Sequence, residues 1–417
     1  MAKSTFHRPA TGARDLLPLD VVQKQWVERH LRAVFERWGY RRIITPTLER
    51  LDTLTAGGAV QPGSVLQVRD SEGTMLGLRP EMTASIARAA ATRMAGTALP
   101  LRLYYNANVF RNARHDNEFF QAGVELIGAP GWLADTEVML LLAECLSALD
   151  LEDWSLIVGE VGLTESLLST ISPSAKADVH RAIANLDRVF LETAEMPESD
   201  RQAALQVLDL RGEPTDVFRK LQGLTLPSTE RQRVTALEQL CNGLTAQGVP
   251  LVLDLSLLDG FGYYTSTVFQ AVCGSERLGL GGRYDSLFSL YSPTSGNQAG
   301  IGFSLTLESL QRVLQSSDRL PQSSRKTHTL VVPTEAEAVP HVLKLAAELR
   351  SQHPNRGIEI ELLGDFAAAD KGRTPEEITE YARSCDIEEI TWVQADGSFH
   401  TTSTQLTSLE HTVGEPV

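Results

Sequence analysis

The first forty residues contain one strongly amphipathic stretch. In VVQKQWVERHLRAVFERWGY (residues 21–40), apolar positions recur at steps of three and four residues, and Gly39 follows the last turn of the pattern. This is the period at which side chains return to the same face of an α-helix, and glycine commonly ends a helix. The pattern therefore predicts a helix that packs one face against a core.

Short β-branched and aromatic runs alternate with two further helical patterns up to residue 149. Runs of this kind predict strands, and the three-to-four periodicity predicts helices. The expected strands are RRIITPTLE (41–49), VLQVRD (65–70), TMLGLRPE (74–81), RLYYNANVF (102–110) and EFFQAGVELIG (118–128), and the expected helices are TASIARAAATRMA (83–95) and EVMLLLAECLSAL (137–149). Because strands follow one another without an intervening helix, the fold class is α+β rather than a series of βαβ units.

The pattern changes at about residue 161. From there to about 248 it is helical and polar, broken by proline and glycine, which indicates a helical insertion. Strands are expected again in VPLVLDLSLL (249–258), GYYTSTVFQAVC (262–273) and RLGLGGRYDSLF (277–288), and AGIGFSLTLESLQRVLQ (299–315) is expected to be a strand that passes into a helix. We therefore predict a core of residues 1–316 that straddles the insertion.

A second domain is expected after a Ser-rich, polar linker at 317–327. Residues 328–417 alternate strand and helix patterns, as in a small α/β domain. They contain 6 Lys or Arg against 16 Asp or Glu, a net charge of −10. This excess of acid disfavours binding to a nucleic acid, so we interpret the domain either as the remnant of a former nucleic-acid-binding domain or as a protein-contact domain.

Composition excludes several classes of protein. With 42% hydrophobic and 22% charged residues the chain is typical of globular proteins, and no apolar run approaches the ~18 residues of a membrane span. The first residues, MAKSTFHRPATGARD, are positively charged but precede no apolar stretch, so we expect no signal peptide and a cytoplasmic protein. The net charge of −15 disfavours a nucleic acid as the principal partner.

Metal and cofactor chemistry is not expected either. The four cysteines include no CxxC pair, and the nine histidines form no HxxH or HExxH spacing. Widely separated cysteines of this kind are typical of reduced, packed thiols.

Two polar side chains fall on one face of the expected strand 118–128. In that strand Gln121 and Glu125 point the same way, with backbones about 13 Å apart at ~3.3 Å per residue. They could bracket a small zwitterion that carries a polar group at each end. The alternative is that they form the solvent face of a half-exposed sheet.

Other segments offer complementary groups for such a ligand. Glu81 and Thr83 supply an acid and a hydroxyl suited to an ammonium group, and Arg111 offers a bidentate fork for a carboxylate. Tyr263 and Tyr264 supply aromatic faces and phenol groups that can pack against an imidazole and hydrogen-bond to it. Taken singly, each residue also has an ordinary structural interpretation as a core, surface or ion-paired side chain.

The ordered motifs of the chain resemble those of histidyl-tRNA synthetases. The resemblance runs from about residue 12 to 314 and is carried by GARDLLP, RRIITPTLE, LRPEMTASIAR, NVFRNARHDNEFFQAGVELIG, GYYTSTVF, GGRYDSL and GIGFSLTLESL. It implies a class II synthetase-like antiparallel sheet flanked by helices, with a histidine pocket. It also implies that Glu81, Thr83 and Gln121 lie near the amino group of histidine, Arg111 and Gln121 near its carboxylate, and Glu125, Tyr263 and Tyr264 around its imidazole.

Three positions depart from the synthetase pattern. Where the family carries a catalytic arginine before the paired tyrosines, this chain has Asp259, a charge reversal. One unit-charge pair at ~4 Å and an effective dielectric of ~20 is worth about 4 kcal/mol, so the change replaces attraction to phosphate by repulsion. Ala113 replaces an acid that helps to seat ATP, in a shortened loop, and Ser309 replaces an arginine that holds the triphosphate. We therefore expect no activation of histidine with ATP.

A chain with a histidine pocket and without the means to adenylate histidine is similar to the regulatory subunits of ATP phosphoribosyltransferase. The resemblance implies a noncatalytic subunit that is required for the first step of histidine biosynthesis and carries feedback regulation by L-histidine. The implied partner is the short catalytic subunit of ATP phosphoribosyltransferase, and the implied assembly is a homodimer within a hetero-oligomer. Two alternatives are an active histidyl-tRNA synthetase and a free-standing tRNA-binding regulator, which the acidic charge disfavours.

Overall fold

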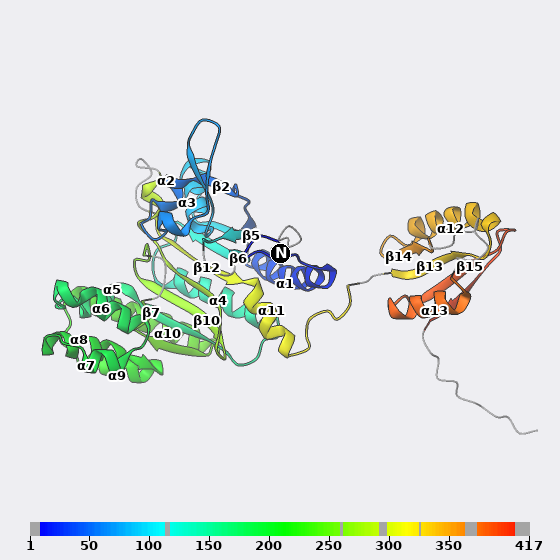
Figure 1. Cartoon of the computed structure of the whole chain (residues 1–417). Helices are drawn as coiled ribbons and strands as arrows, with labels where there is room; N and C mark the ends of the chain where they lie inside the picture. Colours follow the sequence, from blue (N-terminus) through cyan, green and yellow to red (C-terminus); the bar gives the residue numbers. More distant parts are fainter. Residues whose placement is uncertain are drawn as a thin grey trace, which may run out of the picture. The chain divides into compact units, whose positions relative to one another are not determined.

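The computed structural model describes residues 9–112, 117–258, 262–291, 298–324, 327–362 and 373–404. The chain divides into two compact units, Met1–Leu320 and Pro321–Val417 (Figure 1). No helix among the described residues is long and apolar enough to cross a membrane.

A nine-stranded sheet forms the centre of the first unit, in the order β1-β5-β6-β12-β11-β10-β7-β9-β8. Neighbouring strands are antiparallel except for the pairs β1/β5 and β7/β9, which are parallel. The strands are β1 (Arg41–Arg42), β5 (Leu101–Phe110), β6 (Glu118–Ile127), β7 (Trp154–Glu160), β8 (Arg211–Gly212), β9 (Leu251–Asp254), β10 (Thr267–Cys273), β11 (Glu276–Arg283) and β12 (Gly300–Thr306). This arrangement confirms the predicted α+β, largely antiparallel sheet.

Helices cover both faces of this sheet. On one face lie α1 (Pro18–Arg37), α4 (Trp132–Ala148) and α11 (Leu307–Ser316), and on the other lies α3 (Thr83–Thr92) (Figure 1). The alternation along β5 follows from this layering, because Tyr104 belongs to the core of the first face while its neighbours pack under α3. The neighbours that pack under α3 are Leu103 and Tyr105.

The first helix forms as its periodicity predicts. Its apolar positions are buried, namely Val27, Leu31, Val34 and Phe35. Pro18 occupies the first turn, where no backbone N–H is needed, and Asp20 accepts the backbone N–H of Leu17 at 2.9 Å. Gly39 adopts a φ of 77° just after the helix, a conformation that favours glycine.

A small three-stranded sheet leads the chain to α3. Its order is β2 (Leu48–Arg50), β4 (Met75–Leu78) and β3 (Gln67–Arg69), all antiparallel, with the short helices α2 (Leu51–Thr55) and η1 (Pro62–Ser64) between β2 and β3. The chain leaves β4 and passes through residues 79–82 directly into α3. Residue 81 therefore lies at the start of a helix that covers the large sheet.

A helical segment, green in Figure 1, lies between β7 and β9. It consists of α5 (Val161–Leu167), α6 (Pro173–Ala184), α7 (Arg188–Thr193), α8 (Glu198–Asp209), α9 (Pro214–Gln222) and α10 (Ser228–Ala246). Two strands here were not predicted from the sequence. The two-residue β8 pairs with β9 at the sheet edge, and β7 pairs with β10 and β9 well inside the sheet.

The predicted strand 262–273 begins five residues later than expected, at Thr267. The neighbouring strand β7 ends at Glu160, which is opposite Thr267, so earlier residues have no strand partner on that side. Tyr263 and Tyr264 instead lie in a turn that precedes β10. This turn is attached to β11, because Thr265 donates its backbone N–H to the carbonyl of Arg283 at 2.7 Å.

The second unit has a four-stranded sheet among its described residues, in the order β14-β13-β15-β16. The strands are β13 (Thr327–Pro333), β14 (Gly357–Ile360), β15 (Glu389–Val393) and β16 (Phe399–Ser403). Only the pair β15/β16 is antiparallel. The helices α12 (Val339–Gln352) and α13 (Pro375–Ser384) pack on different sets of strand residues, as expected for an α/β alternation in which successive strand side chains point to opposite faces.

Candidate functional site

A narrow cavity lies between the large sheet, α3 and the turn that carries the paired tyrosines. Only about 10 Å³ of it is wide enough for the centre of a water molecule, so it holds roughly one water without movement of its walls. Five of the seven residues predicted to bind histidine line it: Glu81, Thr83, Gln121, Tyr263 and Tyr264. Of the further residues that line it, three carry hydroxyl groups and were not singled out in the sequence analysis: Tyr105, Tyr284 and Ser304.

Two buried carboxyl groups are joined through Thr83. Glu81 is 2% exposed and Glu125 is 1% exposed. The carboxylate of Glu81 accepts the backbone N–H groups of Thr83 and Ala84 and so satisfies the first turn of α3. The hydroxyl of Thr83 donates to Glu125 Oε1 at 2.7 Å. The start of α3 therefore brings an acid and a hydroxyl against the middle of β6.

Tyr284 completes the surroundings of Glu125. Its phenol donates a hydrogen bond to Glu125 Oε2. Burial raises the pKa of Glu125 to about 8, against the hydrogen bonds from Tyr284 and Thr83, which lower it. Burial also raises the pKa of Glu81. The sequence motif GGRYDSL contains Tyr284, but nothing in the motif showed that its side chain would meet Glu125.

Arg111 lies near Glu81, directly after the end of β5. Its Nε donates to the carbonyl of Pro80 at 3.3 Å, and its guanidinium lies 4.7 Å from the ring centroid of Phe119. Burial lowers the pKa of Arg111, while the nearby charge of Glu81 raises it. The guanidinium therefore supplies positive charge close to Glu81.

Gln121 is 3% exposed, and its Oε1 has no hydrogen-bond partner among the described residues. A buried acceptor of this kind gains from an N–H donor brought by a ligand. The alternative that Gln121 and Glu125 form a solvent face is wrong, because α3 and the tyrosine turn cover that face of β6. Both groups point into the protein.

The tyrosines form an aromatic wall. The rings of Tyr263 and Tyr264 lie 5.2 Å apart at 77°, and those of Tyr263 and Tyr284 lie 6.1 Å apart at 80°, both edge-to-face. Tyr264 packs directly on Gly282, where a Cβ would lie 2.7 Å from its ring. The strand therefore needs glycine at this position to admit the ring.

Of the three positions that depart from the synthetase pattern, only Ser309 lies among the described residues. Ala113 and Asp259 lie outside the described residues. Ser309 lies in the first turn of α11 and lines a second cavity together with Arg14, Glu118 and Phe119. Its hydroxyl is not a cation, so it cannot replace an arginine opposite a triphosphate.

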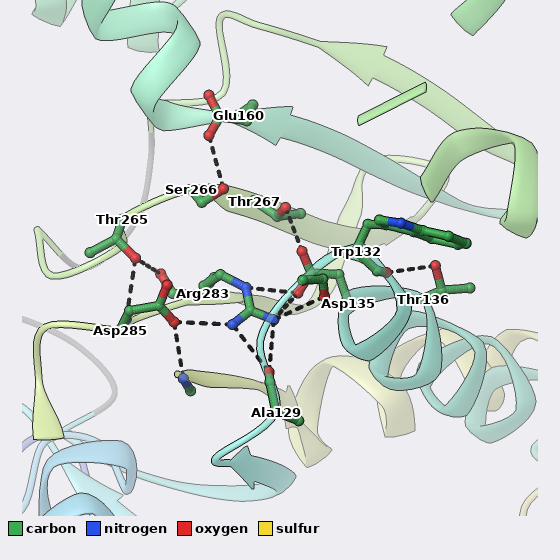
Figure 2. A network of polar contacts seen from close by, with 12 residues as sticks. Ala129, Trp132, Asp135, Thr136, Glu160, Thr265, Ser266, Thr267, Arg283 and Asp285 are labelled. Atoms are coloured by element: carbon green, nitrogen blue, oxygen red, sulfur yellow. Dashed lines mark hydrogen bonds and ion pairs between the residues drawn. The ribbon is translucent and has the colours of Figure 1, made fainter. Parts of the chain in front are cut away.

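A buried ion-pair cluster that the sequence analysis did not predict joins the end of β11 to the start of α4 (Figure 2). Arg283 donates from Nε to Asp135 at 2.9 Å and from Nη1 to Asp285 at 3.0 Å. Thr267 donates to the other oxygen of Asp135 at 2.9 Å. These charges are paired with one another, so the cluster holds β11 and the start of α4 together. Across the described parts of the chain, no group of three His, Cys, Asp or Glu side chains is placed to hold a metal ion.

Comparison with known proteins places this geometry in a family. The family model described as histidyl-tRNA synthetase matches residues 12–310. A protein from Synechococcus sp. (strain JA-3-3Ab) named ATP phosphoribosyltransferase regulatory subunit is 54% identical over 399 residues, which cover 94% of this chain and 93% of that protein. A protein of the same name from Cyanothece sp. (strain PCC 7425 / ATCC 29141) is 47% identical over 402 residues, covering 94% and 98% of the two chains.

Solved structures agree with this placement. A protein from Bacillus halodurans described as an ATP phosphoribosyltransferase regulatory subunit/histidyl-tRNA synthetase superposes with a TM-score of 0.78 at 25% identity, covering 94% of this chain and 99% of that one. The histidyl-tRNA synthetase of Nostoc sp. PCC 7120 superposes with a TM-score of 0.76 at 22% identity and covers 96% and 97% of the two chains, which shows a shared fold. The predicted synthetase-like fold is thereby confirmed.

Proposed function

The chain belongs to the family of ATP phosphoribosyltransferase regulatory subunits, and from this premise we propose that it controls a separate catalytic subunit by binding free L-histidine in the pocket on β6. The walls of the pocket must move apart to admit the ligand, because the cavity as it stands holds roughly one water. A regulatory subunit is not a catalyst by itself. The proposed partner is the short catalytic subunit of ATP phosphoribosyltransferase, and the proposed assembly is a homodimer of this chain within a hetero-oligomer.

The buried acids Glu81 and Glu125 are the observation that supports histidine most directly. Glu81 lines the cavity, Glu125 is joined to it through Thr83, and Arg111 is the cation near Glu81, so the site favours a ligand that brings N–H donors. Histidine brings an ammonium group and an imidazole at opposite ends. The unpaired Oε1 of Gln121 is a further acceptor for an N–H group, and Arg111 can pair with the ligand carboxylate.

Glu125 is well suited to an imidazole in particular. With a pKa of about 8 it carries a proton at neutral pH, whereas free imidazole has an ordinary pKa near 6.5. The carboxyl O–H can donate to an imidazole nitrogen, or pass its proton to the ring and accept the resulting N–H. In both cases one proton is shared between the two groups, which a phenyl or aliphatic side chain cannot do.

Feedback also requires that histidine binds two states of the complex unequally, since equal affinity would shift no equilibrium. The test is the activity of the reconstituted complex against added histidine, with Gln121→Leu as the variant. Loss of an acceptor for a charged donor costs about 1.5 kcal/mol or more, so inhibition should need at least about tenfold more histidine. Gln247→Leu, at an exposed helix end, is the matched control and should behave as wild type.

An active histidyl-tRNA synthetase is the second candidate, because the matching family model describes that enzyme. Against it stands Ser309, where the synthetase pattern has an arginine, together with Ala113 and Asp259 in the sequence. The distinguishing assay is histidine-dependent exchange of pyrophosphate into ATP by the purified chain. We expect no exchange, and clear exchange would reject the noncatalytic assignment.

A further inference from the structure

Glu160 is a buried acid that the proposed pocket does not use directly. It is the last residue of β7 and immediately precedes α5, and it is 3% exposed. Its carboxylate accepts hydrogen bonds from three different segments: the backbone N–H of Leu163, the hydroxyl of Ser266 at 2.9 Å, and Nη1 of Arg233 at 2.7 Å. Figure 2 shows the bond from Ser266.

The bond from Ser266 holds the segment that follows the paired tyrosines. Ser266 lies two residues after Tyr264, at the end of the turn that carries the paired tyrosines. The backbone of the same turn is attached there as well, because Val161 donates its N–H to the carbonyl of Ser266 at 3.0 Å. Glu160 therefore fixes the end of the tyrosine turn nearest the helical segment.

The bond from Arg233 reaches the helical segment itself. Arg233 lies on α10, and its side chain is 36% exposed. Its guanidinium packs against Gly162, so a larger residue there would have to displace this side chain. A cavity of about 400 Å³ adjoins the ion pair, lined in part by Gln232, Thr265 and Asp285. The contact between α10 and the sheet is thus polar and partly open at this point.

We propose that Glu160 is a positioning residue for the tyrosine wall, and that its ion pair with Arg233 makes the affinity of the pocket for histidine depend on the helical segment. This inference rests on the proposed function. Because coupling between sites is reciprocal, histidine favours the arrangement in which the Glu160 and Arg233 pair is formed. A protein that docks on the helical segment and moves α10 then changes the affinity for histidine, and histidine changes the affinity for that protein by the same factor.

The test is calorimetric titration of L-histidine into the full chain and its variants. Arg233→Met and Ser266→Ala each remove one bond to Glu160, and each should weaken histidine binding about tenfold, within the range of couplings between sites. The double variant should bind histidine more weakly than either single variant. Its loss of affinity relative to wild type should be smaller than the product of the two single losses, because both act through Glu160. Arg219→Met, which breaks an exposed ion pair on α9, is the control and should leave affinity unchanged.

Hydrogen exchange separates positioning from simple stabilisation. Histidine should increase the protection of α10 amides in the wild-type chain and not in Arg233→Met, which a purely structural ion pair would not cause. Unchanged affinity in both single variants, or fully multiplicative losses in the double variant, would overturn the inference while leaving the proposed function standing. Absence of histidine binding in the wild-type chain would overturn the proposed function and this inference with it. Ser266→Ala carries the test if Arg233→Met does not fold.

Discussion

Replacing Glu125 by glutamine should stabilise the chain relative to wild type more at high pH than at low pH. Burial holds the pKa of Glu125 at about 8 in the folded protein, against an ordinary value of 4.5. The folded state therefore binds the proton more tightly than the unfolded state does. Between pH 4.5 and 8 the folded state carries more protons, so stability falls as pH rises through this window and levels off above it.

The size of the effect follows from the two pKa values. Relative to its value at low pH, the free energy of unfolding of wild type is lower by about 2 kcal/mol at pH 6 and by about 5 kcal/mol at pH 9 because of this one group. The glutamine side chain resembles the protonated acid in shape and can hydrogen-bond with Thr83 and Tyr284, and it does not titrate. The stability of Glu125→Gln minus that of wild type should therefore rise by about 3 kcal/mol between pH 6 and pH 9.

Urea unfolding followed by tryptophan fluorescence at pH 6, 7, 8 and 9 measures this difference without added histidine. The signal reports mainly on the first unit, which contains four of the five tryptophans. Glu118→Gln makes the same chemical change at a half-buried position on the same strand and serves as the control. Parallel curves for wild type and Glu125→Gln across this pH range would refute the assignment of a buried, proton-binding acid at the pocket.

Three further predictions concern the surroundings of the pocket. Gly302→Ala places a methyl group against the carboxylate of Glu125 and the carbonyl of Val124, so urea unfolding should show a loss of about 1–3 kcal/mol, whereas Gly63→Ala, with open space around it, should change little. Arg283→Met leaves Asp135 buried without its cation and should cost about 3–5 kcal/mol in the same assay, with a smaller loss when Asp135→Asn is added. In the folded chain a thiol reagent should react slowly with the two buried cysteines, Cys145 and Cys241, and mass spectrometry of the modified peptides checks which thiols react first.

Local patterns along the chain were enough to predict most of the elements. The three-to-four periodicity of residues 21–40 predicted α1, and β-branched and aromatic runs predicted β5 and β6, because helical periodicity and strand propensity are properties of a few consecutive residues. The strand β7 escaped prediction although WSLIVGE is β-branched and aromatic in part. Its assignment as a strand depends on the partners β10 and β9, and β9 lies more than ninety residues further along the chain.

In the candidate site, too, local pattern predicted some features and the packing of distant segments decided the others. The sequence placed Gln121 and Glu125 on one face of a strand, yet it left open whether that face meets solvent or a second layer. Burial of that face is decided by α3 and by the turn at Tyr263, which come from distant parts of the chain. The loss of positive charge at Asp259 remains a prediction from the sequence, because this residue lies outside the described ones.

The sequence by itself thus determined which elements form, which side chains share a face, and which family the motifs resemble. Only the tertiary structure decided that Tyr284 meets Glu125 and that Glu160 joins Ser266 to Arg233. The physical reason is that periodicity is a property of a few consecutive residues, whereas burial and hydrogen bonding depend on which distant segments pack together. The raised pKa of Glu125 is a consequence of that packing, and no local pattern around residue 125 encodes it.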